Sequence, residues 1–177
     1  MKFTDAIEEL QVKYGRIETT KAFSSFKDHR SRGSVVTASM KDRPTEMQEA
    51  LACYMTAMVE QKHHQLWELQ ASIGKSIIKS VTGLRAIDIG LCTKVHHVTA
   101  NLSLQHRDTE DFKDMLALAG FSNKVEHHHT LDFAVGHAQL VIIDEADRFI
   151  FSEPHRLVKL MKKCKVICLT ATTTSNR

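Results

Sequence analysis

Apolar residues recur along the chain at two spacings, one typical of helices and one typical of buried strands. Apolar residues three or four positions apart predict helices over 3–14, 46–59, 102–118 and 154–163, and a further helix that opens at 76–80. Short apolar runs predict strands over 66–69, 94–99, 139–143 and 166–169. Strands that alternate with helices indicate an α/β fold with a mainly parallel sheet. Ligands of such sheets bind at the carboxyl ends of the strands, so we expect the functional residues there.

The composition is that of an ordinary globular protein and excludes several other classes. Hydrophobic residues make up 42% and charged residues 25% of the 177 positions, which is enough apolar material for one compact domain. A net charge of +3 is too small to indicate binding to nucleic acid or membranes by itself. No run approaches the roughly 20 apolar residues of a membrane span, so we expect no membrane-spanning segment.

The four cysteines, at positions 53, 92, 164 and 168, include no Cys-x-x-Cys pair. In a chain of this size the spacing predicts reduced thiols in an intracellular protein, located in the cytoplasm or nucleus, with organelles left open. Cys164 and Cys168 are expected at the buried ends of a strand, and Trp67 in the core beside the first strand.

We expect two segments along the chain. Residues 1–40 form an N-terminal helix and a connector, because 24–43 are polar and basic. The connector is either a solvated tail or a basic arm that binds a partner. Residues 41–177 form the main domain.

The first candidate for chemistry is a group of carboxylates at the end of a buried strand. The apolar run 140–143 is followed directly by Asp144, Glu145 and Asp147. Asp144 can hold Mg²⁺ through water, because this hard cation prefers oxygen ligands and retains several waters. Glu145 can polarise an attacking water. The alternative is that these acids cap the next helix and interact favourably with its dipole.

The second candidate is a loop between a predicted strand and a predicted helix. Phosphate binding requires backbone N–H groups, a lysine as a point charge and a hydroxyl for Mg²⁺. Lys75 and Ser76 supply the last two, and the start of the helix adds a partial positive charge. The alternative is an ordinary helix start. The loop consists of Gln70, Ala71, Ser72, Ile73, Gly74, Lys75 and Ser76.

The third candidate is the pair of hydroxyls in Thr170 and Thr172, directly after the apolar run 166–169. Hydroxyls at the end of a neighbouring strand can hydrogen-bond to the acidic motif and sense its nucleotide state. By itself, Thr-Ala-Thr is typical of a turn.

In this order, the three motifs resemble those of the superfamily 2 helicases, and more narrowly the first RecA-like domain of DEAD-box-like ATPases. The resemblance runs from about residue 43 to the C-terminus. It implies a P-loop NTPase fold, which is a three-layer αβα domain with a mainly parallel sheet. It also implies ATP and Mg²⁺ as cofactors and a nucleic acid, RNA more than DNA, as partner. The roles implied are phosphate binding by Lys75, Mg²⁺ binding by Ser76 and Asp144, water activation by Glu145, and coupling to movement by Asp147, Thr170 and Thr172.

Two further segments match the family by position. Residues 43–48 look like the adenine-reading Q motif, with Gln48 as its glutamine, because an amide offers both a donor and an acceptor. The alternative is a helix start with Thr45 as cap. Residues 98–108 match motif Ia, which implies contacts to a nucleic-acid backbone by Thr99, Asn101 and Arg107. Here the alternative is that Asn101 caps a helix and Arg107 is solvated.

The sequence of the second segment, Val98-Thr99-Ala100-Asn101 followed by Arg107-Asp108, more closely resembles that of the SecA preprotein translocase ATPases, which have Val-Thr-x-Asn followed by an Arg-Asp pair. An unfolded polypeptide is therefore the alternative partner. After the acidic motif, Arg148-Phe149 continues as in the DEAD-box helicases and unlike the usual SecA wording.

The chain departs from the family pattern A-x-x-G-x-G-K-T, because Leu69 and Ser72 stand in place of Ala and the middle Gly. A non-glycine residue held at positive φ costs about 1–2 kcal/mol, so we expect weakened nucleotide binding or a different turn. Only five residues follow Thr172. We therefore expect a truncated helicase domain 1 with little activity alone, with a second RecA-like domain supplied elsewhere. A non-catalytic relic is the third hypothesis.

The eleven histidines include two tracts, 63–64 and 127–129, that could be read as metal sites. Neither tract has the helical spacing or the paired carboxylate of a zinc site, so we predict no metal there. His96 and His97 are expected to point to opposite faces of the sheet.

Overall fold

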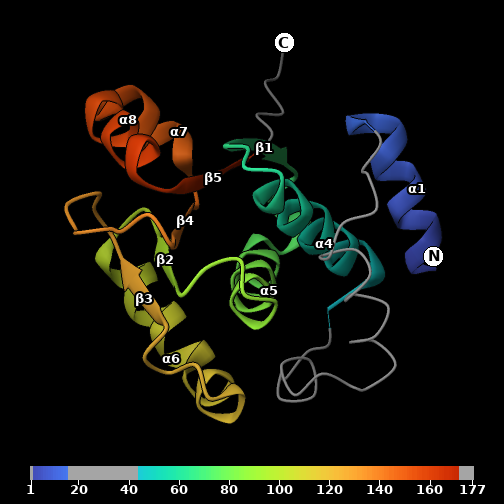
Figure 1. The fold of residues 1–177 in the computed structure, drawn as a ribbon, viewed down its shortest axis with the longest axis horizontal. Helices are drawn as coiled ribbons and strands as arrows, with labels where there is room; N and C mark the ends of the chain where they lie inside the picture. The colour runs from blue at the N-terminus through green and yellow to red at the C-terminus, as the bar shows by residue number, and fades with distance from the viewer. Residues whose placement is uncertain (1, 16–43, 172–177) are drawn as a thin grey trace.

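The computed structural model describes residues 2–15 and 44–171, which form a five-stranded, all-parallel sheet with helices on both faces (Figure 1). The strands lie in the order β1-β5-β4-β2-β3. Their bounds are β1 (Gln65–Leu69), β2 (Lys94–Val98), β3 (Val125–His128), β4 (Gln139–Ile143) and β5 (Lys165–Ala171). The helices are α1 (Phe3–Tyr14), α4 (Glu46–Glu60), α5 (Lys75–Asp88), α6 (Leu102–Ala119), α7 (Ala146–Ser152) and α8 (Pro154–Lys163), with a 3₁₀ turn, η1 (Ala71–Ile73).

The sheet separates two hydrophobic cores, which makes the three layers that the sequence predicts. One core joins α1, α4, α5 and α6 to alternate residues of the strands, such as Val95, Ile142 and Ile167. The other joins α7 and α8 to the intervening residues, such as Val98 and Val141. Both faces of β4 and β5 are therefore covered, which is why these strands are continuous apolar runs in the sequence.

The sequence located the predicted helices and strands to within a few residues, with α5 starting at Lys75. One difference concerns β5, which continues through Thr170 and Ala171, where we considered a turn. It continues because β1 pairs with it to the end, with Glu68 opposite Thr170 and Leu69 opposite Ala171.

Two elements are absent from the sequence prediction. The strand β3 is only four residues long and has no apolar run; its polar residues Glu126 to His128 include two of a histidine tract. The helix α7 has only seven residues, too few for helical periodicity to be recognised, and Pro154 at the start of α8 separates the two helices.

The N-terminal helix α1 packs against α4, and its Ala6, Ile7 and Leu10 are buried in the same core. Tyr14 at its end contacts the edge of the Trp67 ring, with 4.7 Å between the ring centroids. Trp67 is buried in the core beside β1, as predicted. The connector predicted over 24–43 lies outside the described residues, and the division of the chain at residue 40 stays a prediction.

The four cysteines are free thiols and are buried, as expected for Cys164 and Cys168. Burial raises the pKa of Cys53 and of Cys92 to about 12, and the pKa of Cys164 and of Cys168 to about 11. The thiols are therefore protonated at neutral pH and behave as small apolar groups.

A buried ion pair fixes α6 against α5. The ammonium of Lys79 lies 2.8 Å from a carboxylate oxygen of Asp108, and the two side chains are 0% and 1% exposed. Arg107 binds the other oxygen of Asp108 at 3.1 Å. A buried charge is tolerated only when it is paired, so this contact holds the two helices in one arrangement.

A glycine in the middle of α5 allows the helix to approach β2 closely. A Cβ atom at Gly83 would lie 2.9 Å from Nε2 of His97 and 3.1 Å from a methyl of Val95. His97 is fully buried there, and desolvation together with the charge of Lys79 holds its pKa well below the usual range. The ring is therefore neutral and packs as a core residue.

Within the described residues, no helix combines the length and the apolar character needed to cross a bilayer.

We expect Asp108→Ala to lower the free energy of unfolding by about 3–5 kcal/mol, because it leaves Lys79 charged and unpaired in the interior. The matched control is Arg156→Ala, which removes the exposed pair of Arg156 with Glu153 and should cost no more than about 1 kcal/mol. Urea unfolding followed by circular dichroism measures both. Equal losses in the two variants would contradict the structural role of the buried pair.

Candidate functional site

The strand order brings the predicted motifs to one edge of the sheet. The strands β1, β5, β4 and β2 are adjacent and parallel. Each is followed by one predicted motif: the phosphate loop follows β1, the threonine pair lies at the end of β5, the acidic motif follows β4, and residues 98–108 follow β2. Parallel strands end at the same edge, where α/β proteins bind their ligands.

The loop after β1 forms a 3₁₀ turn and then a left-handed residue before α5 begins. Ile73 N–H donates to the carbonyl of Gln70 at 3.1 Å, and Gly74 has a φ of 83°. Lys75 is the first residue of α5, and its ammonium has no hydrogen bond or ion pair to any of the described residues. Ser76 follows it in the first turn, so both side chains lie at the positive end of the helix dipole.

Gln48 clamps this loop from the start of α4. Its Nε2 donates to the carbonyl of Ile73 at 2.7 Å, and its Oε1 accepts from the N–H of Thr45 at 2.9 Å. The hydroxyl of Thr45 accepts in turn from the N–H of Gln48 at 3.2 Å. Thr45 is therefore the helix cap that the sequence suggested, and Gln48 is also a residue of the candidate site.

Gly74 is the position where the clamp leaves no room for a side chain. A Cβ atom there would collide with Nε2 of Gln48, and the left-handed backbone disfavours any residue but glycine. The need for glycine at the start of Gly-Lys-Ser therefore comes in part from Gln48, which lies 26 positions earlier in the chain.

Ser72 does not carry the backbone strain that we considered. It lies in η1, is exposed, and is not one of the two non-glycine residues at positive φ in the described part of the chain, which are Lys62 and Glu145. The loop therefore accommodates Ser72 by forming a 3₁₀ turn.

The acidic motif begins where β4 ends. The N–H of Asp144 donates to the carbonyl of Val98 at 2.9 Å, and a carboxylate oxygen of Asp144 accepts from the N–H of Glu145, also at 2.9 Å. Glu145 has a φ of 50° and a ψ of 46°, which is a left-handed conformation that costs a non-glycine residue about 1–2 kcal/mol. Glu145 is not a side-chain cap of α7. Its side chain is exposed at the sheet edge.

The acidic motif and the segment after β2 are joined. Arg148 in α7 donates to the carbonyl of Ala100 at 2.5 Å, in addition to the bond between Asp144 and Val98. Two hydrogen bonds thus link the acidic motif and the start of α7 to residues 98–100.

The three residues predicted to contact a partner lie in different surroundings. Thr99 is 2% exposed and its hydroxyl lies 3.3 Å from the carbonyl of His128. Asn101 is exposed and caps α6 by accepting from the N–H of Leu104 at 2.9 Å. Arg107 is exposed and bound to Asp108. The alternative predicted for Asn101 is therefore present.

Of the two predicted coupling hydroxyls, Thr170 is half-buried near the end of β5. Thr172 lies outside the described residues. Asp147 is exposed in the first turn of α7, where its charge interacts favourably with the helix dipole.

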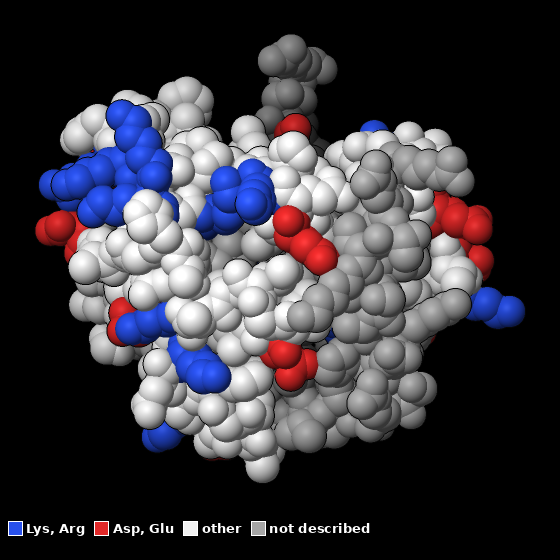
Figure 2. Space-filling view, viewed as in Figure 1, with Lys and Arg blue, Asp and Glu red and all other residues white. Residues whose placement is uncertain are grey.

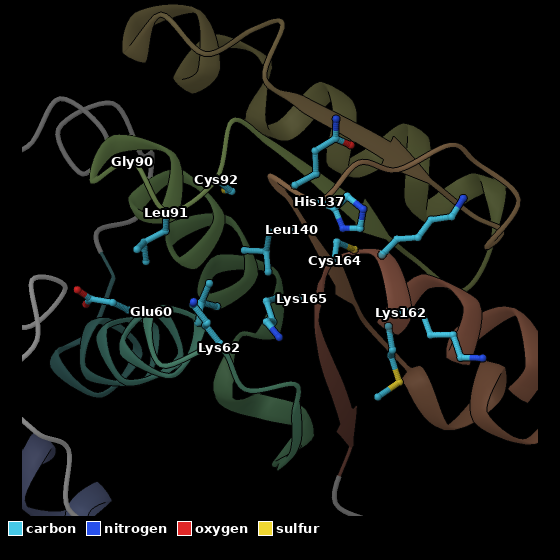
Figure 3. Close-up of a pocket in the computed structure, with 14 residues that line it drawn as sticks. Glu60, Lys62, Gly90, Leu91, Cys92, His137, Leu140, Lys162, Cys164 and Lys165 are labelled. Carbon is cyan, nitrogen blue, oxygen red and sulfur yellow. The ribbon is translucent and has the colours of Figure 1, made fainter.

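A cavity of about 600 Å³ lies at the opposite edge of the sheet, where the strands begin (Figure 3). It is lined by the end of α4, the turn after α5, the first residues of β4 and β5, and the end of α8. Lys62, Lys162 and Lys165 make it basic, and Figure 2 shows further Lys and Arg side chains over α8. We base the candidate site on the motif edge, because a loop that binds phosphate with backbone N–H groups needs no deep cavity.

One cluster of titratable groups was missed by the sequence analysis. His96, Glu126 and His128 bring their ring nitrogens and a carboxylate oxygen together on the face of the sheet that α7 and α8 cover. The sequence does place Glu126 and His128 two positions apart, as residues on one face of a strand are. Recognising that His96 joins them requires the register of β3 against β2.

Comparison with solved structures identifies the fold as that of RecA-like helicase domains. The SWI2/SNF2 ATPase core of Sulfolobus solfataricus, solved in complex with double-stranded DNA, aligns with 78% of this chain at a TM-score of 0.55 and 15% identity. The UvsW helicase of bacteriophage T4 aligns with 98% at a TM-score of 0.52 and 13% identity. The chain spans 34% of the length of the first structure and 86% of the second.

No protein-family model matches the sequence, and a comparison with curated proteins finds no match.

We expect Gly74→Ala to destabilise the protein more than Gly90→Ala. Both glycines have a positive φ, of 83° and 77°, but a Cβ atom at Gly90 meets nothing within 4 Å, whereas one at Gly74 collides with Gln48. The left-handed conformation should cost about 1–2 kcal/mol at either position, and the collision adds to it at Gly74. Chemical unfolding of both variants measures the difference.

The Gln48→Ala background is the control for that comparison. It removes the colliding amide, so the extra loss at Gly74 should shrink, while the loss at Gly90 stays the same. An extra loss that is unchanged in this background would show that the clamp does not determine the need for glycine at position 74.

Proposed function

We propose that this chain is the ATP-binding domain of a superfamily 2 helicase-type ATPase, which couples ATP hydrolysis to the remodelling of a nucleic acid. One observation carries the proposal: the loop ending in Lys75 and Ser76, the hydroxyl of Thr170 and the carboxylates of Asp144 and Glu145 leave three adjacent parallel strands at one edge. The likeness of the fold to helicase domains supports it.

The residues at this edge suit ATP and Mg²⁺. The ammonium of Lys75 is unpaired among the described residues, and Gly74 brings the backbone close without a side chain in the way. We assign Lys75 to the phosphates and Ser76 and Asp144 to the ion. Bound Mg²⁺ supplies positive charge to the phosphate oxygens. The exposed Glu145, held in a left-handed conformation, orients the attacking water.

Gln48 and the backbone of Gln70, Ala71, Ser72 and Ile73 complete the proposed nucleotide site. The amide of Gln48 donates one hydrogen to Ile73 and accepts one bond from Thr45. Its second hydrogen and its second lone pair remain for an adenine edge. Adenine recognition and the shape of the phosphate loop then depend on the same side chain.

We place the partner surface on the segment after β2, with Asn101 and Arg107 as its exposed polar residues and Asp147, Thr170 and Thr172 as the coupling residues. We infer that a conformational change on hydrolysis is transmitted to this surface through the hydrogen bonds of Asp144 to Val98 and of Arg148 to Ala100. We infer RNA as the first partner to test and DNA as the second. A second RecA-like domain, which contributes an arginine finger, raises turnover by about 10³–10⁵ in this type of ATPase.

The alternative, an ATPase that translocates polypeptides, rests on the resemblance of residues 98–108 to the sequence of the SecA translocases. Stimulation of ATP hydrolysis by an unfolded polypeptide, and not by RNA or DNA, would favour it. The absence of any thermal shift with ATP and Mg²⁺ would favour the third hypothesis, a non-catalytic relic.

We expect Lys75→Ala to abolish the rise in melting temperature that ATP and Mg²⁺ produce, because the phosphates lose their cation. For comparison, ligand at 100 times its Kd stabilises a protein by about 2.7 kcal/mol. Glu145→Gln should retain the rise but stop hydrolysis. Lys159→Ala, in an exposed lysine of α8, is the control and should behave as the wild type. Full ATPase activity in Lys75→Ala or Glu145→Gln would remove the assignment.

The Ser72→Gly variant tests whether the serine weakens nucleotide binding. Since Ser72 is exposed and carries no left-handed strain, relief of backbone strain cannot be the cause of tighter binding, which leaves crowding of the phosphates by its side chain as the effect to test. We expect tighter ATP binding in the variant, measured by calorimetric titration. Unchanged or weaker binding would contradict the crowding effect.

A further inference from the structure

Two histidines and a glutamate converge on one face of the β2–β3 pair, away from the proposed nucleotide site. Nδ1 of His96 lies 2.9 Å from Nε2 of His128. One carboxylate oxygen of Glu126 lies 3.5 Å from each of these two nitrogens. The parallel register sets His96 opposite Glu126, and His128 follows two positions later on the same face.

The tautomer of His96 follows from its neighbours. Oε1 of Gln139 accepts from the backbone N–H of Gly136 at 3.2 Å, which identifies that atom as the amide oxygen. Nε2 of His96 lies 2.7 Å from the same oxygen and must therefore carry the proton. Nδ1 is left with its lone pair directed at His128 and Glu126. Histidine ligands of metals are typically oriented in this way, by a hydrogen bond from the other ring nitrogen.

Glu126 is also oriented by a second contact. Its other carboxylate oxygen pairs with the ammonium of Lys94, so the oxygen that faces the histidines is held in place. His128 presents its Nε2 to the same space, 2.9 Å from Nδ1 of His96 and 3.5 Å from the carboxylate oxygen.

The connection between β3 and β4 covers the histidines with an aromatic ring. Phe133 stacks on His128 with 3.9 Å between ring centroids and on His96 with 4.8 Å. His96 is 2% exposed and His128 is 19% exposed, whereas Glu126 is 47% exposed. The three groups therefore form a cluster that is closed on the protein side and open to solvent at the carboxylate.

We propose that His96, Glu126 and His128 form a binding site for Zn²⁺, with Nδ1, one carboxylate oxygen and Nε2 as ligand atoms. Ligand atoms that lie 2.0–2.1 Å from a tetrahedral zinc ion are about 3.3 Å from one another. The three separations here, 2.9, 3.5 and 3.5 Å, differ from that value by only a few tenths of an ångström. Two imidazoles and one carboxylate are a ligand set that zinc accepts and Mg²⁺ does not favour.

The fourth position of the ion faces solvent beside Glu126 and takes water. Because His96 belongs to β2 and the other two ligands belong to β3, the ion links the two strands. It therefore fastens the four-residue edge strand to the sheet. The site needs no nucleotide, so its test is independent of the proposed function.

The experiment is a titration of the full chain with Zn²⁺ in competition with a chromophoric chelator, at neutral pH. We expect one equivalent to bind to the site and to raise the melting temperature. Loss of an outer partner typically weakens metal binding by about 10–100-fold, so loss of a ligand should reach at least the upper end of that range, about 100-fold. Glu126→Gln and His128→Gln should both show this loss.

The matched control is His129→Gln. His129 belongs to the same histidine tract as His128 but is not one of the three clustered residues. It lies 2.6 Å from Gln105 and is exposed. His129→Gln should bind zinc as tightly as the wild type. If it loses affinity as His128→Gln does, zinc binds the exposed tract and the proposal is wrong. No binding by the wild type would also overturn it, and the contacts would then be a hydrogen-bond network only.

Cobalt provides a readout of the coordination geometry, taken on variants whose circular dichroism shows that they are folded. Co²⁺ in a four-coordinate site with nitrogen and oxygen ligands should give an intense visible absorption band that Zn²⁺ displaces. The band should be present in the wild type and in His129→Gln, and absent from Glu126→Gln. A weak band typical of six-coordinate cobalt in the wild type would contradict the tetrahedral geometry.

Discussion

The insertion of β5 between β1 and β4 is the constraint on which the candidate site depends. β1 and β4 are not neighbours, and only their common pairing with β5 brings the phosphate loop and the acidic motif to one edge. β5 can hold this place because its residues 166–169 are apolar and both of its faces are covered. A polar substitution inside β5 would therefore affect the candidate site as well as the core.

The clamp by Gln48 joins a helix start, a turn and a glycine into one unit. The side chain caps its own helix through Thr45 and holds the carbonyl of Ile73, so α4 and the loop cannot move separately without breaking a half-buried hydrogen bond. The same contact explains why Gly74 is required. On the other side of β5, Arg148 and Asp144 fix the segment after β2 to the acidic motif. The proposed nucleotide site thus has one half held by the contact between α4 and the loop, and one half joined by hydrogen bonds to residues 98–100.

Local apolar patterns predicted most elements, the parallel sheet and the edge that carries the motifs, whereas the three layers followed from the resemblance to RecA-like domains. Contacts between distant segments could not be predicted in the same way. For Thr45 and Gln48 the sequence offered a helix cap or a site residue as alternatives. The structure shows the cap, and it also shows a bond from Gln48 to the carbonyl of Ile73 that the sequence could not predict; the role of Gln48 in nucleotide binding stays a proposal. For Ser72 the sequence could not decide between strain and a changed turn, since the answer depends on the backbone of η1.

The histidine cluster shows the same limit more clearly. Taken alone, the tract 127–129 has no spacing typical of a zinc site, and the sequence therefore predicts no metal there. The partner, Glu126, is adjacent in the sequence, but the second histidine comes from β2, about 30 residues earlier. Only the register of two parallel strands sets His96 opposite Glu126, and a shift by one residue would have sent it to the other face.

The position of β3 at the end of the sheet has a consequence for self-association. An edge strand offers unpaired backbone groups to which another chain can add a strand. β3 limits this risk by its length of four residues and by the charged Glu126 at its centre, two of the means by which proteins discourage edge-to-edge pairing. The short polar sequence that makes β3 difficult to recognise is therefore also what keeps this border of the molecule from templating aggregates.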